Sequence, residues 1–323
     1  MADTAWIPSD FARYDLPLRD AALRLKVTEA FLDRLVAAGL PTGGPGGAFV
    51  DANDVFNVAL DVGAPSTLPA LGFRGALRWL RRPLRTLTSA RSWGCAFTVP
   101  ETATGPVLVA LPAPEGHGGA WRPAPGTAGA RDGRWEVPPG GTARGVADLR
   151  GLRAPIRSEL IREHVRAVLR SGQRWAKLPL ALQTRPEVVS SLGYATCVSI
   201  SLSLSAALRT AGFEVRTRRG YLIAPVGTGH SWVEVVDEDG RTKAIDPVLV
   251  LLRRRLEALE PVPDTSADPE DELVDGLLAN RVLPSDLTAE APLAVDADGA
   301  PVELTTAFRT MPLTGGDQDE EAQ

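Results

Sequence analysis

The sequence predicts an α+β protein, with a mainly helical N-terminal part and a later segment in which a helix precedes antiparallel strands. Two observations predict this class. Apolar residues between positions 18 and 60 recur at the spacing of helix faces. Between positions 197 and 247, a long apolar run ends at Gly212 and is followed by short segments typical of antiparallel strands.

The composition is that of an ordinary soluble globular protein. The 323 residues are 44% apolar and 23% charged, and this length allows two compact units of roughly 100 to 200 residues each. A net charge of −5 provides no global field that would attract nucleic acid or an anionic membrane. The N-terminus lacks a basic stretch followed by an apolar run, and no apolar stretch approaches the ~18 residues of a spanning helix. We therefore expect a cytoplasmic protein.

Cysteine and histidine are scarce. The cysteines are Cys95 and Cys197, and the histidines are His117, His164 and His230. These are too few for a disulfide scaffold or a thiolate zinc site, so we predict no metal. The cysteine chemistry described below implies no organic cofactor either. Cys95 is expected to be structural. His164 is expected on a helix face and His117 in a glycine-rich loop, so neither is given a role.

Three helices are predicted in the first hundred residues. The first spans Leu18 to Ala38, where glycine-rich sequence follows. Asp51 can cap the second, which ends near Gly63. The third spans Phe73 to Arg82 and is stopped by the proline that follows.

The predicted third helix carries a basic stripe. Arg74, Arg78 and Arg81 are spaced so that they share one face of this helix. One interpretation is a solvated surface paired with the many carboxylates of the chain. Another is a docking surface for an acidic partner, such as a carrier protein or a phosphorylated substrate. DNA binding by a helix-turn-helix between residues 27 and 60 is a third interpretation, disfavoured by the net charge and by the lack of identifiable base-reading side chains.

The chain divides into four predicted regions. Residues 1–100 form a mainly helical N-terminal region, and residues 101–150 form a glycine- and proline-rich linker or a small β segment. Residues 151–260 form the core that carries the candidate site, beginning with a helix at about 158–169. Residues 261–323 form a C-terminal extension with an acidic tail.

Cys197 opens a segment whose secondary structure is ambiguous. Val198 to Ser205 alternate with a period of two, as in a half-buried strand. However, Ile200, Leu204 and Leu208 also recur every four residues, and the alanines that precede Leu208 favour helix. We predict a helix with Cys197 at its N-terminus, where unpaired N–H groups and the helix dipole stabilise a thiolate.

A β-hairpin is predicted after this helix. The predicted strands occupy residues 214–224, 229–236 and 241–245. With residues 237–240 as the loop, Asp246 would face Ser231, one position from His230. A small bulge or a one-residue shift would then bring the carboxylate against the imidazole.

Cysteine-based acyl transfer needs a thiolate, a histidine that moves its proton and a third group that orients the imidazole. Cys197, His230 and Asp246 supply the nucleophile, the base and the orienter in this order. Each also has a purely structural explanation, as a core cysteine, a strand histidine and a carboxylate that ends a strand before Pro247. Their occurrence together favours the catalytic interpretation.

Several strings in this segment resemble the core of bacterial transglutaminase-like proteins. They are Tyr194-Ala195-Thr196-Cys197, Ala206-Ala207-Leu208-Arg209-Thr210-Ala211-Gly212-Phe213-Glu214-Val215-Arg216, Gly220-Tyr221, His230-Ser231-Trp232-Val233-Glu234-Val235 and Ala244-Ile245-Asp246-Pro247. The resemblance covers about residues 155–250. It implies a papain-like α+β core in which the helix bearing Cys197 packs against an antiparallel sheet bearing His230 and Asp246.

Further residues are candidates for the substrate site. Trp175 and the backbone from Thr196 to Cys197 are candidates for polarising the acyl oxygen. Trp232 is expected to pack under the hairpin, beside the substrate.

The expected function is acyl transfer through an acyl-enzyme on Cys197, by a bacterial biosynthetic or peptide-processing enzyme. The substrate would be a peptide, an amide or a carrier-bound thioester. The resemblance implies an acyltransferase or a cysteine peptidase or amidase, and it leaves open whether an amide bond is made or cleaved. Two alternatives remain: a non-catalytic peptide-binding scaffold of the same fold, and a DNA-binding regulator that uses the N-terminal helices.

Overall fold

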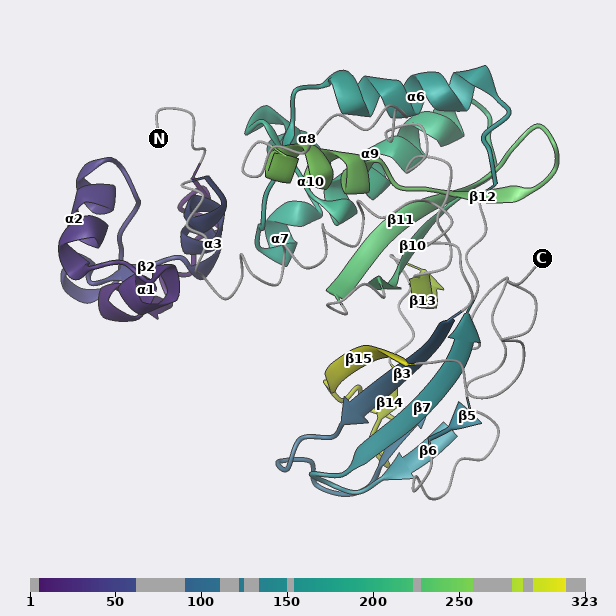
Figure 1. The fold of residues 1–323 in the computed structure, drawn as a ribbon, viewed down its shortest axis with the longest axis horizontal. Coiled ribbons are helices and arrows are strands. Elements are labelled where there is room, and N and C mark those ends of the chain that lie inside the picture. Colours follow the sequence, from purple (N-terminus) through teal and green to yellow (C-terminus); the bar gives the residue numbers. More distant parts are fainter. Residues whose placement is uncertain are drawn as a thin grey trace, which may run out of the picture.

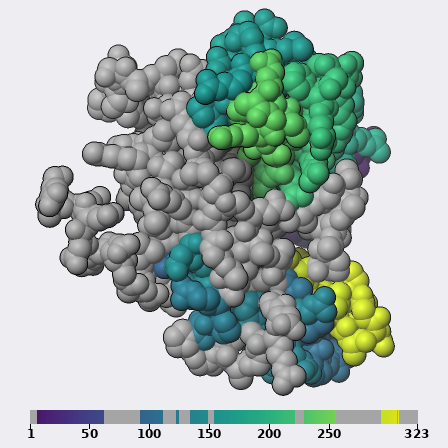
Figure 2. All heavy atoms as spheres, turned by 90° about the vertical axis from the view of Figure 1, so that its right-hand side faces the viewer, coloured from purple at the N-terminus to yellow at the C-terminus, as the bar shows by residue number. Residues whose placement is uncertain are grey.

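The computed structural model of the protein has the predicted α+β fold (Figure 1). It describes residues 6–61, 91–110, 122–124, 134–149, 154–222, 228–257, 281–286 and 293–311. Figure 2 shows helices of the core, in teal and green, and strands of two smaller sheets, in blue and yellow, at opposite ends of one face. Among the helices in the described ranges, none is both long and apolar enough to cross a membrane.

The described N-terminal residues form a small helical unit. Its helices are α1 (Leu18–Leu25), α2 (Glu29–Ala37) and α3 (Ala52–Asp61). The chain between them forms the 3₁₀ turn η1 (Pro45–Gly47) and the antiparallel pair β1 (Leu16–Pro17) and β2 (Phe49–Val50). Apolar faces of the three helices form one buried cluster, which includes Leu25, Leu35 and Val55.

The single helix predicted from Leu18 to Ala38 is wrong, because two helices occupy this range. Lys26 has a left-handed backbone (φ 52°) and ends α1. The side chain of Thr28 then accepts a hydrogen bond from the amide of Phe31 and caps α2. The apolar spacing did not reveal the break, since both helices bury their apolar sides in the same cluster.

The predicted cap of the next helix is present. A carboxylate oxygen of Asp51 accepts a hydrogen bond from the amide of Asn53 at 2.7 Å, at the start of α3. The third predicted helix, Phe73 to Arg82, lies outside the described residues.

Two antiparallel sheets combine strands from residues 91–149 with strands from residues 293–311. One has the order β15 (Thr305–Met311), β3 (Arg91–Thr98), β7 (Thr142–Leu149) and β5 (Arg122–Pro123). The other has the order β14 (Ala294–Val295), β4 (Val107–Ala110) and β6 (Arg134–Val137). Buried side chains from both sheets, including Trp93, Phe97 and Trp135, form one cluster.

This pairing differs from the predicted regions. Strand β3 lies within residues 1–100, which we expected to be mainly helical. Strands from residues 101–150 and from the expected C-terminal extension pair within the same sheets. The strand partners are separated by about two hundred residues in sequence, so local patterns gave no sign of them. The four region boundaries stay predictions.

The core contains a four-stranded antiparallel sheet covered by helices. Its order is β12 (Thr242–Ile245), β11 (Thr228–Val236), β10 (Val215–Leu222) and β13 (Arg281–Asp286). The helices α6 (Glu159–Arg170), α9 (Cys197–Thr210) and α10 (Pro247–Glu257) gather on one side of it (Figure 1). Between α6 and α9 lie α7 (Leu180–Gln183), α8 (Pro186–Ser191) and the parallel pair β8 (Arg174–Trp175) and β9 (Tyr194–Ala195).

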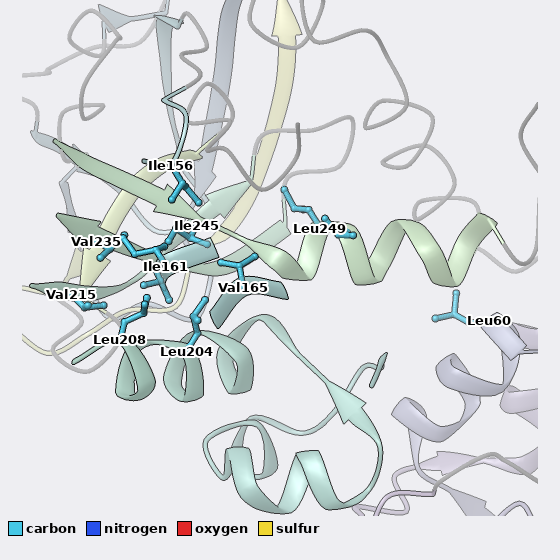
Figure 3. Close-up of a cluster of buried hydrophobic side chains, with 12 residues drawn as sticks. Leu60, Ile156, Ile161, Val165, Leu204, Leu208, Val215, Val235, Ile245 and Leu249 are labelled. Atoms are coloured by element: carbon cyan, nitrogen blue, oxygen red, sulfur yellow. The ribbon is translucent and has the colours of Figure 1, made fainter. Parts of the chain in front are cut away.

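A buried apolar cluster attaches the helices to this sheet (Figure 3). Leu204 of α9 and Val165 of α6 pack with Val235 of β11 and Leu249 of α10. Burying each such side chain contributes about 1.5 to 3 kcal/mol, so these contacts fix the helix bearing Cys197 on the sheet. Leu60 of α3 belongs to the same cluster, which joins the N-terminal helices to the core.

Candidate functional site

Cys197 is the first residue of α9. The hydroxyl of Thr196 accepts a hydrogen bond from the amide of Ser199, and the hydroxyl of Ser199 accepts one from the amide of Thr196, both at 3.0 Å. This reciprocal capping box satisfies two backbone donors and fixes where the helix begins. The predicted helix and the position of Cys197 at its start are confirmed.

The helix outweighs the strand-like alternation because burial follows the four-residue spacing. Ile200, Leu204 and Leu208 are all at most 4% exposed and line one side of α9. The intervening serines suit a helix, since Ser203 and Ser205 donate their hydroxyls to carbonyls three residues earlier. The alternating serines are therefore compatible with a helix, because their hydroxyls can hydrogen-bond to backbone carbonyls of the same helix.

The hairpin after β11 has a longer loop than predicted. Val236 pairs with Thr242, so residues 237–241 form the loop. The amide of Asp237 donates to the carbonyl of Arg241 at 3.0 Å and closes this loop. The predicted four-residue loop is wrong by one residue.

This shift changes which residues of β11 lie on the same face of the sheet as Asp246. The predicted pairing of Asp246 with Ser231 is wrong, because Val233 pairs with Ile245. The same register, continued by one residue, places Asp246 opposite Trp232. Side chains alternate along a strand, so Asp246 becomes a diagonal neighbour of His230 on the same face, without a bulge.

The three candidate residues meet through two hydrogen bonds. His230 Nε2 lies 2.6 Å from Asp246 Oδ2, and the two residues are only 8% and 1% exposed. This contact leaves Nδ1 of the imidazole for the thiol of Cys197, which hydrogen-bonds His230. Cys197 also receives a hydrogen bond from the amide of Ser231. Cys197 as a whole residue is partly exposed.

The electrostatics favour a thiolate–imidazolium pair. Burial alone would raise the pKa of Cys197, but the hydrogen bond and charge of His230 and the amide of Ser231 outweigh burial and lower it, against a small opposing effect of Asp246. Burial alone would lower the pKa of His230, whereas the charge and hydrogen bond of Asp246, together with Cys197, raise it. The two shifts have the directions that an activated cysteine requires.

The residues predicted to polarise the acyl oxygen differ in whether they have a free hydrogen-bond donor. The amide and the hydroxyl of Thr196 both donate to the hydroxyl oxygen of Ser199, at 3.0 and 3.1 Å, so both donors of Thr196 already have a partner within the protein. The amide of Cys197 is a first-turn donor that the helix itself does not satisfy. Trp175 on β8 is partly buried and packs against the same cluster as Cys197, with its ring edge-on to Phe56 at 6.2 Å.

Trp232 is a packing residue. It is 1% exposed, and its indole N–H donates to a carboxylate oxygen of Glu234 at 3.1 Å. The prediction that it packs under the hairpin fits this burial. A direct role in binding substrate does not, because its polar group already has a partner within the protein.

Sequence reasoning missed the amide of Ser231 and the anchor of the hairpin. The amide of Ser231 could not be predicted, because every residue except proline has a backbone N–H and no residue type marks the one that will be used. The anchor is Lys243, which is 1% exposed and donates to Asp237 Oδ2 at 2.5 Å and to the carbonyl of Pro155 at 2.6 Å. No local pattern predicted the burial of Lys243, because burial along β12 does not alternate: the last three of its four residues are all buried.

The remaining candidates either lie on other elements or fall outside the described residues. Cys95 is buried in β3, where its thiol donates a hydrogen bond to the carbonyl of Gly145, and burial raises the pKa of the thiol to about 12. His164 is half-buried on α6. His117, Arg74, Arg78 and Arg81 lie outside the described residues. Within the described ranges, no group of three or more His, Cys, Asp or Glu side chains is arranged to hold a metal ion.

Comparison with known proteins agrees with this arrangement. Residues 158–247 match the transglutaminase-like superfamily. No curated protein matches the chain. A solved structure described as "a Putative Cysteine Protease from Cytophaga hutchinsonii" is similar, at 10% identity and a TM-score of 0.36, over 71% of this chain and 93% of that chain. The family match identifies the core: the chain carries a transglutaminase-like superfamily domain, which spans residues 158–247 and contains Cys197, His230 and Asp246.

Proposed function

We propose that the protein is a cysteine-dependent enzyme that transfers acyl groups through a thioester on Cys197. The observation that carries this proposal is the chain of hydrogen bonds from the Cys197 thiol through His230 to Asp246, at the start of a helix. In this arrangement Cys197 is the nucleophile, His230 transfers protons, and Asp246 orients the imidazole and stabilises its charged form.

The first half of the reaction forms the acyl-enzyme. The Cys197 thiolate attacks the carbonyl carbon of an amide or thioester, a carbon–sulfur bond forms, and negative charge develops on the oxygen. The imidazolium of His230 gives its proton to the departing amine or thiol as the bond to that group breaks. The amide of Cys197, at the positive end of the α9 dipole, is the donor best placed to stabilise the oxyanion.

The second half releases the acyl group. Neutral His230 takes a proton from an incoming amine or water, which attacks the thioester carbonyl, and the carbon–sulfur bond breaks to restore the thiolate. An amine gives a new amide, and water gives hydrolysis. The substrate classes that fit this chemistry are a peptide, a simple amide or a carrier-bound thioester, including one delivered by an acidic carrier protein.

The same geometry favours catalysis over the alternative of a binding scaffold. A scaffold that kept only the fold would not need to keep the thiol, the imidazole and the carboxylate in contact. Here all three are in contact, and Cys197 is partly exposed. The shifted pKa values of Cys197 and His230 are also typical of functional sites.

The proposal is tested by measuring alkylation of the native protein with iodoacetamide from about pH 5 to about pH 9, with the labelled cysteine located by mass spectrometry. Cys197 should react at pH values well below ~8.5, the ordinary pKa of a thiol. Cys95 is an internal control, because its buried thiol should stay unlabelled in the folded protein. Cys197→Ala should remove the low-pH labelling without unfolding the protein.

Labelling of Cys197 only above ~8.5 would show an ordinary thiol and overturn the proposal. If Cys197 reacts at low pH, the acyl-enzyme can be sought directly. An activated thioester or ester should add one acyl group, seen as a mass increase on the peptide that contains Cys197. Added amines should then compete with water for that acyl group.

A further inference from the structure

The N-terminal helical unit is hydrogen-bonded to the core through one buried side chain. Asn57 of α3 is 1% exposed, and its side-chain amide group donates to the carbonyl of Lys177 at 2.9 Å. Its side-chain oxygen accepts a hydrogen bond from the amide of Lys177, also at 2.9 Å. A single side chain of α3 therefore holds both backbone groups of a residue that lies just after β8.

The other edge of this backbone segment pairs with β9. The amide of Arg174 donates to the carbonyl of Gly193 at 2.9 Å, and the amide of Ala176 donates to the carbonyl of Ala195 at 3.1 Å. Alternate residues of a strand direct their backbone groups to opposite sides, so Asn57 bonds the edge that β9 leaves open. The segment is thus held from two sides, by β9 and by α3.

Strand β9 leads directly into the helix of the nucleophile. Ala195 is the last residue of β9, Thr196 caps α9, and Cys197 is the first residue of that helix. A shift of β9 would therefore move the Cys197 thiol. His230 is held by other contacts, which are the pairing of β11 with β10 and the hydrogen bond with Asp246.

Apolar contacts of α3 reinforce the bonds of Asn57. The ring of Phe56 lies edge-on to the ring of Trp175 in β8, with the ring centres 6.2 Å apart. Leu60, one turn further along α3, belongs to the buried cluster that contains Leu204 of α9. Phe56, Asn57 and Leu60 recur at helical spacing, so one face of α3 meets the core.

We infer that Asn57 is a positioning residue for the proposed acyl transfer, because it keeps β8 and β9 where they hold the Cys197 thiol against His230. The inference rests on the proposed function, since it concerns the geometry of that thiol. A thiol that moves away from His230 loses the hydrogen bond and the charge that lower its pKa. The N-terminal helical unit is thereby part of the acyl-transfer site, through its contact with the strand behind the nucleophile.

Asn57→Leu tests the inference, because leucine is of similar size and cannot bond Lys177. Iodoacetamide labelling of Cys197 should reach half its maximal rate about one pH unit higher than in the native protein, which makes it about tenfold slower at pH 6. Hydrogen exchange at the amide of Ala176, measured by NMR of the full chain, should become about tenfold faster as its bond to β9 loosens. Urea unfolding shows whether the variant is folded.

Asn57→Ser is a milder second variant, for the case in which Asn57→Leu does not fold. Its shorter hydroxyl side chain cannot bond both backbone groups of Lys177 at once. It should shift the pH dependence of labelling in the same direction by a smaller amount.

Two substitutions are controls. Val58 is 1% exposed and packs with α1 and α2, so Val58→Ala should lower the stability of the N-terminal unit without moving the pH at half-maximal labelling. Lys177 is exposed, with its ammonium group 4.9 Å from the centre of the Phe56 ring. Lys177→Ala keeps the backbone bonds to Asn57 and should also label like the native protein.

A folded Asn57 variant with the native pH dependence of labelling would overturn the inference. An equal shift in Val58→Ala would overturn it too, because lost stability alone would then explain the effect. If Cys197 of the native protein reacts only above ~8.5, the proposed function fails and this inference fails with it. An activated native thiol that the Asn57 variants leave unchanged would refute this inference alone.

Discussion

The ammonium group of Lys243 lies 2.5 Å from a carboxylate oxygen of Asp237, and both side chains are buried at the closed end of the hairpin formed by β11 and β12. Asp237 also accepts hydrogen bonds from the amides of Arg157 and Ser158, which precede α6. The pair thus ties the hairpin that carries His230 to the helix layer that carries Cys197.

Replacing Lys243 with methionine should destabilise the protein by about 3 kcal/mol, because Asp237 keeps a buried charge without its cation. Urea unfolding of the full chain measures this change. Arg241→Met is the matched control, since Arg241 is exposed in the same loop and its loss should cost no more than about 0.5 kcal/mol. Equal effects of the two substitutions would show that the buried pair contributes nothing specific.

Asp237 should also make stability depend on acidic pH. Burial alone would raise the pKa of this carboxyl, but the amide of Arg157, Lys243 and the amides of Glu238 and Ser158 lower it to about 2. Because the folded pKa lies below the unfolded value of about 3.9, the stabilisation is fully present above that value and is lost as pH falls toward 2.

Asp237→Asn should therefore be less stable than the native protein at pH 6, and the difference should shrink between about pH 4 and about pH 2. Denaturant unfolding at a series of pH values measures it. Glu163→Gln is the control, because Glu163 is exposed on α6. A difference between native protein and Asp237→Asn that stays constant over this range would contradict the assigned contacts.

Asp246→Asn should slow alkylation of Cys197 at pH 6 by about tenfold, which corresponds to a rise of one unit in the pH at which the thiol becomes reactive. The carboxylate of Asp246 raises the pKa of His230, and the charged imidazole in turn lowers the pKa of Cys197. Iodoacetamide labelling rates measure the shift. Glu234 lies on β11, the strand that carries His230. Glu234→Gln is the control and should leave the labelling rate of Cys197 unchanged.

Gly43→Ala should destabilise the N-terminal helical unit by about 1 to 3 kcal/mol, the usual cost of overpacking. A Cβ atom at this position would lie 2.5 to 2.8 Å from ring carbons of Tyr14. Thermal unfolding measures the loss, and adding Tyr14→Ala to Gly43→Ala should recover part of it. Gly105→Ala is the control, because a Cβ atom there meets nothing within 4 Å. Similar losses at both glycines would rule out the steric explanation.

The sequence determined most of the local structure around the site. The four-residue recurrence of Ile200, Leu204 and Leu208 identified α9, and the turn signal after Val236 identified the hairpin. The order of cysteine, histidine and aspartate, with its resemblance to transglutaminase-like proteins, identified the core. These features depend on neighbours within a few turns or across one hairpin, so local propensity and spacing specify them.

Tertiary structure decided which distant groups meet. The loop length placed Asp246 on the face of His230, and the packing of α9 on β10 and β11 brought Cys197 to the imidazole and to the amide of Ser231. The pairing of β15 with β3 and the burial of Lys243 were equally absent from local patterns. Each depends on side chains far apart in sequence competing for the same buried space, and no single segment carries that information.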